Sequence, residues 1–234
     1  MKSLIIIGTY NECENIENLL NQIFKEAPEV NVLVVDDNSP DKTYEIVERL
    51  QNSAYSNKLF LLKRPGKMGL GSAYVAGFNY ALNNGYDVIM HMDADFSHNP
   101  KYIPDFLREI QTNDLVLGSR YVKGGGVVNW GLGRKVMSYG GSLYARTILG
   151  LKTRDLTGGF KCFRREVLES IGINQLKSNG YSFQVETTYK TFLKGFKIKE
   201  IPIIFEDRRV GKSKMSSTIF LEALLMVVKL RFSH

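Results

Sequence analysis

Short apolar runs alternate with amphipathic stretches through the first half of the chain. The apolar runs lie at 4–7, 32–35, 59–62, 88–90 and 115–118. The stretches between them, at about 12–26, 41–52, 71–84 and 101–111, have the composition and spacing of helices. This alternation predicts an α/β fold with a mostly parallel sheet covered by helices on both faces.

The second half of the chain follows a less regular pattern. After a glycine-rich loop at 123–126, we expect helices at 133–149, 165–171, 182–195 and 218–232, a short strand after 155–160 and a strand at 198–205. The segment 207–217 is polar, basic and turn-like. Because no internal repeat, low-complexity tract or linker interrupts the chain, the pattern indicates a single domain.

Composition narrows the classes of partner. The 234 residues carry a formal net charge of +7, which favours an anionic partner: nucleic acid, a phosphate-bearing substrate or an acidic membrane surface. Cys13 and Cys162 lie far apart, which argues against a zinc site and fits a reducing compartment. We expect no signal peptide, and the longest apolar stretch, 219–228, falls short of the roughly 20 residues of a membrane span.

The fourth apolar run ends on two carboxylates spaced one residue apart, Asp93 and Asp95. Ligands bind at the carboxyl edge of parallel strands, and two carboxylates held close together there need a cation. One interpretation is therefore a divalent metal bound together with nucleotide phosphates. The other is an Asx turn in which Asp95 caps a helix that starts near Pro100. The spacing alone leaves both open.

Polar residues also follow the other predicted strands. Tyr10 could stack on a base, and Glu12 could accept its hydrogen bonds, although acidic residues also suit a helix start. The acidic stretch 36–41 could bind a ribose or a base edge. Arg120, after the fifth strand, could pair with a phosphate. The loop at 64–71 matches neither a Walker A loop nor a dinucleotide fingerprint, so a structural turn is its default interpretation.

Further basic residues and the histidines allow two interpretations each. Arg134 and Ser138 lie one helical turn apart, while Arg208 and Lys214 lie in the polar loop. Solvated surface positions would explain each of the basic residues, and a mobile flap that closes over a phosphate is the other interpretation of the loop. We expect His91 to be packed in its strand, and His98 to be a turn residue more than a metal ligand.

Eight motifs occur in an order that points to one family. They are TYNE, VVDDNSPDKT, GKMGLG, DADFSH, GSRY, GR with a serine four residues after its arginine, DLTGGF and DRRVGKSK. With them the chain resembles the family 2 glycosyltransferases of the GT-A fold, and within these the dolichol-phosphate or polyprenol-phosphate mannose synthases. The match covers about residues 3–216. One departure is Gly8, where the family commonly has proline.

The resemblance implies a nucleotide-sugar donor, typically GDP-mannose, a polyprenyl-phosphate acceptor, and Mg²⁺ or Mn²⁺. It implies that the guanosine is held by Gly8, Tyr10, Glu12, Val35 and Asp37. It assigns ribose, diphosphate and metal to Asp93, Ala94 and Asp95, with Asp95 and Ser97 as the metal ligands. It assigns the phosphates of donor and lipid to Arg120, Arg134 and Ser138, with Arg208 and Lys214 closing over them.

A phosphate acceptor is already an anionic nucleophile, so the expected reaction is an in-line transfer that inverts the anomeric carbon with little need for a general base. We expect a catalytic domain at 1–216 and an apolar helix at 217–234 that either packs on the domain or touches a membrane or a membrane-bound partner subunit. The expected location is the cytoplasmic face of a membrane.

Three rival functions remain open at this point. A related transferase could use UDP-glucose or a hydroxyl acceptor, in which case Asp155 or Glu186 could serve as the base. A nucleic-acid-binding protein would need a basic face with exposed aromatic residues or a known module, and the sequence shows neither, so no nucleic acid is expected. A catalytically silent nucleotide-sugar sensor is disfavoured by the complete set of Asp95, Arg120 and Arg208.

Overall fold

The computed structural model describes residues 1–176, 178, 180–206 and 217–232. Its strands are β1 Ser3–Thr9, β2 Asn31–Asp36, β3 Leu59–Lys63, β4 Val88–Asp93, β5 Leu115–Ser119, β6 Gly126–Val128, β7 Lys161–Arg164, β8 Ile198–Pro202 and β9 Ile204–Glu206. Its α-helices are α1 Ile16–Glu26, α2 Thr43–Gln51, α3 Leu70–Asn83, α4 Ile103–Glu109, α5 Leu132–Leu149, α6 Arg165–Ser170, α7 Gly180–Leu193 and α8 Ser217–Phe232. Short 3₁₀ turns lie at Pro100–Tyr102 and Ile173–Gln175.

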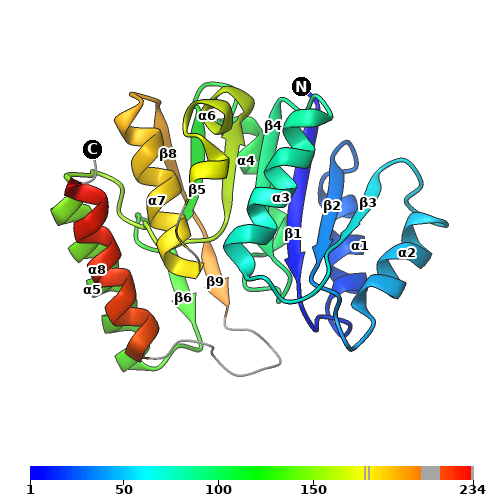
Figure 1. Ribbon diagram of the computed structural model, residues 1–234, viewed down its shortest axis with the longest axis horizontal. Coiled ribbons are helices and arrows are strands. Elements are labelled where there is room, and N and C mark those ends of the chain that lie inside the picture. The colour runs from blue at the N-terminus through cyan, green and yellow to red at the C-terminus, as the bar shows by residue number, and fades with distance from the viewer. Residues whose placement is uncertain (177, 179, 207–216, 233–234) are drawn as a thin grey trace.

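The central sheet has seven strands in the order β3-β2-β1-β4-β7-β5-β8 (Figure 1). Only β7 runs against its neighbours: it pairs antiparallel with both β4 and β5, whereas the other pairs are parallel. The carboxyl ends of β1 to β5 therefore lie at one edge, as the sequence predicts. The predicted mostly parallel, mixed sheet is confirmed.

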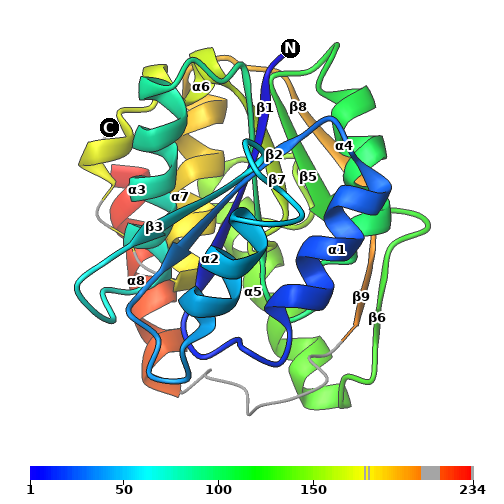
Figure 2. The same ribbon diagram turned by 90° about the vertical axis from the view of Figure 1, so that its right-hand side faces the viewer.

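Helices cover both faces of this sheet, and Figure 2 shows α3 and α7 on one side with α1 and α4 on the other. Alternate residues of β1 supply the two cores: Ile5 and Ile7 pack with α1, α2 and α4, whereas Leu4 and Ile6 pack with α3, α6 and α7. A third core joins α5, α7 and α8, where Val227 and Leu230 of α8 are buried. The part of α8 with described side chains thus packs on the domain.

Two details of the second half differ from the sequence-based prediction. The strand expected at 198–205 is divided into β8 and β9, because Pro202 offers no N–H to continue the ladder and the chain turns there to pair with a different strand. That partner is β6, placed in a loop by the sequence pattern, which pairs parallel with β9 in a separate two-stranded sheet. No described helix is long and apolar enough to cross a membrane. Arg208 and Lys214 lie outside the described residues.

Candidate active site

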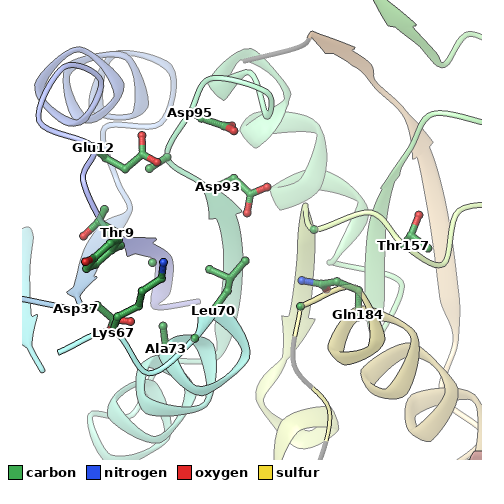
Figure 3. A pocket seen from close by; sticks show the side chains of 16 residues that line it. Thr9, Glu12, Asp37, Lys67, Leu70, Ala73, Asp93, Asp95, Thr157 and Gln184 are labelled. Atoms are coloured by element: carbon green, nitrogen blue, oxygen red, sulfur yellow. The ribbon is translucent and has the colours of Figure 1, made fainter. Parts of the chain in front are cut away.

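A cavity of about 340 Å³ opens at the carboxyl edge of the sheet (Figure 3). Strand ends, the start of α3, and the segments before and within α7 line it. The lining residues are Gly8, Thr9, Tyr10, Glu12, Asp37, Lys67, Gly69, Leu70, Ala73, Asp93, Ala94, Asp95, Thr157, Gly159, Gly180 and Gln184. Among the sequence-predicted residues, those that follow β1, β2 and β4 therefore come together, with the exception of Val35 and Ser97.

The two acids after β2 have different roles. Asp36 is fully buried and accepts hydrogen bonds from the hydroxyls of Thr9 (2.8 Å) and Ser39 (2.6 Å), so it holds the β1 and β2 loops together. Asp37 faces the cavity, where Arg64 donates from Nε (2.6 Å) and the main-chain N–H of Met68 donates at 3.0 Å. The loop at 64–71 thus has a structural role, as expected, and it fixes the Asp37 carboxylate.

The wall next to Asp37 carries an aromatic ring and a cation. The Lys67 ammonium lies 4.6 Å from the centre of the Tyr10 ring, and both residues line the cavity. A Cβ added to Gly8 would lie 2.9 Å from Cδ1 of Leu70, so a larger residue there would displace the Leu70 side chain. Val35 is fully buried in the core and does not line the cavity, so its side chain is not available to a donor.

Asp93 is held by groups from two directions. The buried Tyr74 hydroxyl donates to Asp93 Oδ1 at 3.0 Å, and the main-chain N–H of Asp93 donates to Nδ1 of His98 at 2.9 Å. His98 is buried and stacks on Phe160. Burial lowers the pKa of His98 although Asp93 acts against it, so this ring is neutral and accepts at Nδ1. His98 is therefore a packed turn residue that positions Asp93.

Asp95 forms the Asx turn that one interpretation of the sequence expects. Its Oδ1 accepts from the N–H of Ser97 (3.1 Å) and from the Ser97 hydroxyl. The helix-capping part of that interpretation is wrong, because Asn99 accepts from the N–H of Lys101 at 3.0 Å and caps the turn that begins at Pro100. The short side chain of Asn99 is closer to that turn, which leaves the Asp95 carboxylate on the cavity wall.

The donor set of this edge fits a hard divalent cation. Asp93 and Asp95 supply carboxylate oxygens to the cavity wall, the ligand type that Mg²⁺ and Mn²⁺ prefer, while the Ser97 hydroxyl, buried behind them, donates to Asp95. Within the described residues no group of three or more His, Cys, Asp and Glu could enclose an ion alone. An ion here would complete its shell with phosphate oxygens and water, as is usual for Mg²⁺ bound with nucleotides.

Arg120 lies beside the cavity but not in its wall. Its Nε and Nη2 each donate to the Asp155 carboxylate at 2.7 Å, and Nη2 also reaches the Thr157 hydroxyl at 2.8 Å. Burial alone would raise the pKa of Asp155, yet the charge and hydrogen bonds of Arg120 outweigh it and hold that pKa below its ordinary value. The Arg120 guanidinium, predicted to pair with a phosphate, thus contacts the cavity lining through Thr157.

These contacts bear on the rival that needs a general base. The Asp155 carboxylate accepts from the side chain and the main-chain N–H of Arg120, so its lone pairs are already used. Glu186 accepts from the N–H of Ser178 and lies 3.5 Å from the Lys190 ammonium. Neither carboxylate lines the cavity, so neither is placed as a base towards a bound donor.

Arg134 and Ser138 join Arg120 through a cluster of aromatic rings. The guanidinium of Arg134 lies 4.1 Å from the Trp130 ring centre, and that of Arg120 lies 5.5 Å from the same ring. The Tyr121 hydroxyl donates to Ser138 Oγ at 2.7 Å. The three predicted phosphate-binding residues of this half therefore share one cluster, which contacts the cavity lining where Arg120 donates to Thr157.

His91 is packed, as expected: it is fully buried among Tyr74, Phe78, Phe163 and Phe183. Burial lowers its pKa well below the ordinary value.

Sequence reasoning missed nine lining residues: Thr157, Gly159, Gly180 and Gln184 on the far wall, and Thr9, Lys67, Gly69, Leu70 and Ala73 on the near wall. The motifs TYNE, GKMGLG and DLTGGF contain six of these nine, so motif position was the signal for them. Gln184 lies inside a helix, and no local pattern marks it.

The mixed seven-stranded sheet with helices on both faces and a polar cavity at its carboxyl edge defines a protein of the GT-A fold. The chain belongs to glycosyl transferase family 2, whose model matches residues 4–172. It is similar to the undecaprenyl-phosphate mannosyltransferase of Micrococcus luteus, with 44% identity over 229 residues that cover 98% of this chain and 93% of the relative. It is also similar to the polyprenol monophosphomannose synthase of Mycolicibacterium smegmatis, with 41% identity covering 97% of this chain and 86% of the relative.

Solved structures with low sequence identity share the fold. Glucosyl-3-phosphoglycerate synthase from Mycobacterium tuberculosis, solved with Mn²⁺, UDP-glucose and phosphoglyceric acid, matches with a TM-score of 0.74 at 17% identity over 98% of this chain and 79% of that one. A mannosyltransferase from Pyrobaculum calidifontis, solved with GDP-Man and Mn²⁺, matches with a TM-score of 0.62 at 17% identity over 99% of this chain and 70% of that one.

Proposed function

We propose that this chain transfers mannose from GDP-mannose to a polyprenyl monophosphate with inversion at the anomeric carbon. The observation that carries the proposal is the continuity of two half-sites: the acidic donor cavity meets the Arg120, Arg134 and Ser138 cluster through Thr157. The two relatives above, both named for mannosyl transfer to or phosphomannose formation on a polyprenyl lipid, support the choice of sugar and acceptor.

In this proposal, the two halves of the site bind different parts of the substrates. The near wall, with Tyr10, Asp37 and Lys67, would hold the nucleoside, and Asp93 and Asp95 would face the diphosphate. The lipid phosphate would bind at the Arg134 end. Its oxygen attacks the anomeric carbon as the bond to the nucleoside diphosphate breaks, so the electron pair leaves on GDP and no side chain has to remove a proton. The cationic cluster reduces the repulsion between the two anions.

A divalent metal, Mg²⁺ or Mn²⁺, would be held by Asp95 with Asp93 and Ser97 nearby. When bound, it would neutralise charge on the leaving diphosphate. Ser97 and the Asx turn orient the Asp95 carboxylate before any ligand arrives, because two donors of the turn fix its Oδ1.

The surface next to the Arg134 cluster suits a lipid acceptor. Leu132, Val136, Tyr139 and Leu143 recur at helical spacing along α5 and are between 40% and 80% exposed. This stripe lies on the same helix as Arg134 and Ser138. An apolar stripe flanked by cations fits the surface of a membrane that presents a phosphate headgroup, which supports a peripheral location at a membrane surface.

The test is a donor panel. Purified protein is incubated with polyprenyl phosphate, Mg²⁺ or Mn²⁺, and GDP-mannose, GDP-glucose, UDP-glucose or UDP-galactose, and both nucleoside diphosphate release and glycolipid formation are measured. We expect GDP-mannose to be the preferred donor, and NMR of the product to show the inverted anomer. Preference for a UDP-sugar would reject the donor, and transfer only to hydroxyl acceptors would reject the acceptor.

The metal assignment has its own variant. We expect Asp95→Ala to lower turnover by at least a thousandfold, because it removes the carboxylate closest to the proposed ion. Asp105→Ala, on the exposed surface of α4, is the matched control and should keep wild-type activity. Near-normal transfer by Asp95→Ala with unchanged metal dependence would overturn this part of the proposal.

A further inference from the structure

Gln184 is a buried amide with unused hydrogen-bonding capacity on the far wall of the donor cavity. It lies on α7, its residue is only 4% exposed, and its Oε1 has no hydrogen-bond partner among the described residues. A buried amide oxygen without a partner is costly, and such groups in native structures call for an explanation. A ligand that donates a hydrogen bond inside the cavity would supply the missing partner.

The main chain of Gln184 is held in place more firmly than an ordinary helical residue. Nζ of the buried Lys161, on β7, donates to its carbonyl, and the hydroxyls of Thr187 (3.1 Å) and Thr188 (3.0 Å) donate to the same oxygen. Lys161 is fully buried, so this contact joins α7 directly to the central sheet. The amide of Gln184 is therefore presented from a rigid position.

The geometry places this amide next to the diphosphate edge. A Cβ built on Gly159 would lie 3.6 Å from both Nε2 of Gln184 and Oδ1 of Asp93, so the two side chains flank the same small space. That space exists because Gly159 has no side chain. Figure 3 shows Gln184 on the wall across the cavity from Asp37 and Lys67, with Asp93 between them.

On the same wall, the Thr157 hydroxyl already accepts from Arg120, and across the cavity the Thr9 hydroxyl donates to Asp36 (Figure 3). A donor molecule that places its nucleoside on the near wall and its diphosphate at Asp93 must place its hexose beyond the diphosphate, towards Gln184. A hexose hydroxyl both donates and accepts, and an amide offers one acceptor and two donors, so the two groups are complementary.

Because the donor is taken to be a nucleotide-hexose, as proposed above, we infer that Gln184 binds the hexose hydroxyls and helps to select the sugar. The side chain would hydrogen-bond the sugar but not the nucleoside diphosphate. Sites that hydrogen-bond a hydroxyl discriminate against sugars that place it elsewhere, because their own buried polar group then stays unsatisfied.

The experiment separates the sugar from the nucleotide. Dissociation constants for GDP and for GDP-mannose are measured in the presence of Mn²⁺ on the wild type, Gln184→Ala, Gln184→Met and Gln175→Ala, whose exposed glutamine serves as the control. We expect GDP affinity to stay within about twofold in all four, and GDP-mannose affinity to fall about tenfold in Gln184→Ala, the scale of one or two neutral hydrogen bonds. The preference for GDP-mannose over GDP-glucose in kcat/KM should fall at least fivefold.

Equal weakening of GDP and GDP-mannose, or no weakening of either, would overturn the role of Gln184. Gln184→Met, which keeps the length of the side chain but has neither an amide nor a charge, should weaken GDP-mannose binding to the same extent as Gln184→Ala. A loss in the alanine variant alone would trace to packing and would also overturn the role of Gln184. The two proposals fail separately. If the wild type transfers a different nucleotide-hexose, the donor assignment fails. The dissociation constants of that donor and of its nucleoside diphosphate, measured on the same variants, then decide the role of Gln184.

Discussion

The buried ion pair between Arg120 and Asp155 offers a direct test of how this structure holds the cluster of Arg120, Arg134 and Ser138 in place. We propose to change Asp155→Asn, which keeps the size of the side chain and removes its negative charge. The matched control is Asp105→Asn, because Asp105 pairs with Arg108 at the same Nη2–Oδ1 distance of 2.7 Å as the Arg120–Asp155 pair. The two pairs differ in burial: the side chains are 5% and 0% exposed in the first, and 66% and 45% exposed in the second.

Burial sets the expected magnitudes. Removing one partner of a buried ion pair costs about 3–5 kcal/mol, since the remaining charge was desolvated on folding and has lost its carboxylate. Removing one partner of an exposed pair costs at most about 1 kcal/mol, because water and salt already screen it. Since the total free energy of unfolding of a domain is about 5–15 kcal/mol, Asp155→Asn should lower it by a large fraction and Asp105→Asn should change it little.

Urea denaturation followed by circular dichroism gives the free energy of unfolding of the wild type and both variants. We expect the midpoint to fall strongly for Asp155→Asn with an unchanged slope, as a pure change in stability requires. A difference of less than about 1 kcal/mol between the two variants would refute the reasoning from burial.

The same variant carries a pH signature. The pKa of Asp155 is lower in the folded protein than its ordinary value of 3.8, so its contribution to stability is fully present above that ordinary value. The contribution is lost as the pH falls below about 4 towards the lowered pKa, because the unfolded chain then binds a proton that the folded chain does not. As the pH falls below about 4, the free energy of unfolding of Asp155→Asn should therefore decrease less steeply than that of the wild type. Parallel plots of the free energy of unfolding against pH would contradict this.

Two further predictions concern packing and the lipid surface. Gly77→Ala should lower the free energy of unfolding by about 1–2 kcal/mol, because the new Cβ would lie 2.5 Å from Ile6 Cγ2 on β1. Gly140→Ala, with open space around it, should raise the free energy of unfolding by up to about 1 kcal/mol, because alanine has the higher helix propensity. Urea denaturation measures both, and equal shifts would contradict the packing argument. Val136→Asp in the α5 stripe should reduce flotation with anionic liposomes by several-fold, while Leu193→Asp, at another exposed apolar position on α7, should not. Equal flotation of both variants would remove α5 from the membrane contact.

Much of the fold follows from the sequence because the pattern is local. Each of the five first strands is a continuous apolar run, and such runs form buried parallel strands whose ends share an edge. The pairing of β6 with β9 has no such signal, because three-residue strands show no periodicity and their pairing joins segments nearly eighty residues apart.

The candidate site divides in the same way. Tyr10, Asp37 and Asp95 could be predicted because they directly follow strands. The partner of Arg120 could not, because Asp155 is 35 residues away and only the packing of the DLTGGF segment against β5 brings the two together. Gln184 could not either, because a polar residue in a helix looks like a solvent-facing one until β7 and α7 are placed.

The antiparallel strand β7 sets the distance between β4 and β5. Neighbouring strands lie about 4.8 Å apart, so a single strand inserted between β4 and β5 holds their axes about 10 Å apart. Asp93 ends one of these strands and Arg120 follows the other, and Gly159, which has no side chain, lies just before β7 between them. Under the proposed function, the distance between the leaving and the attacking phosphate, into which a hexose must fit, would be set by hydrogen-bonded sheet spacing and not by flexible side chains.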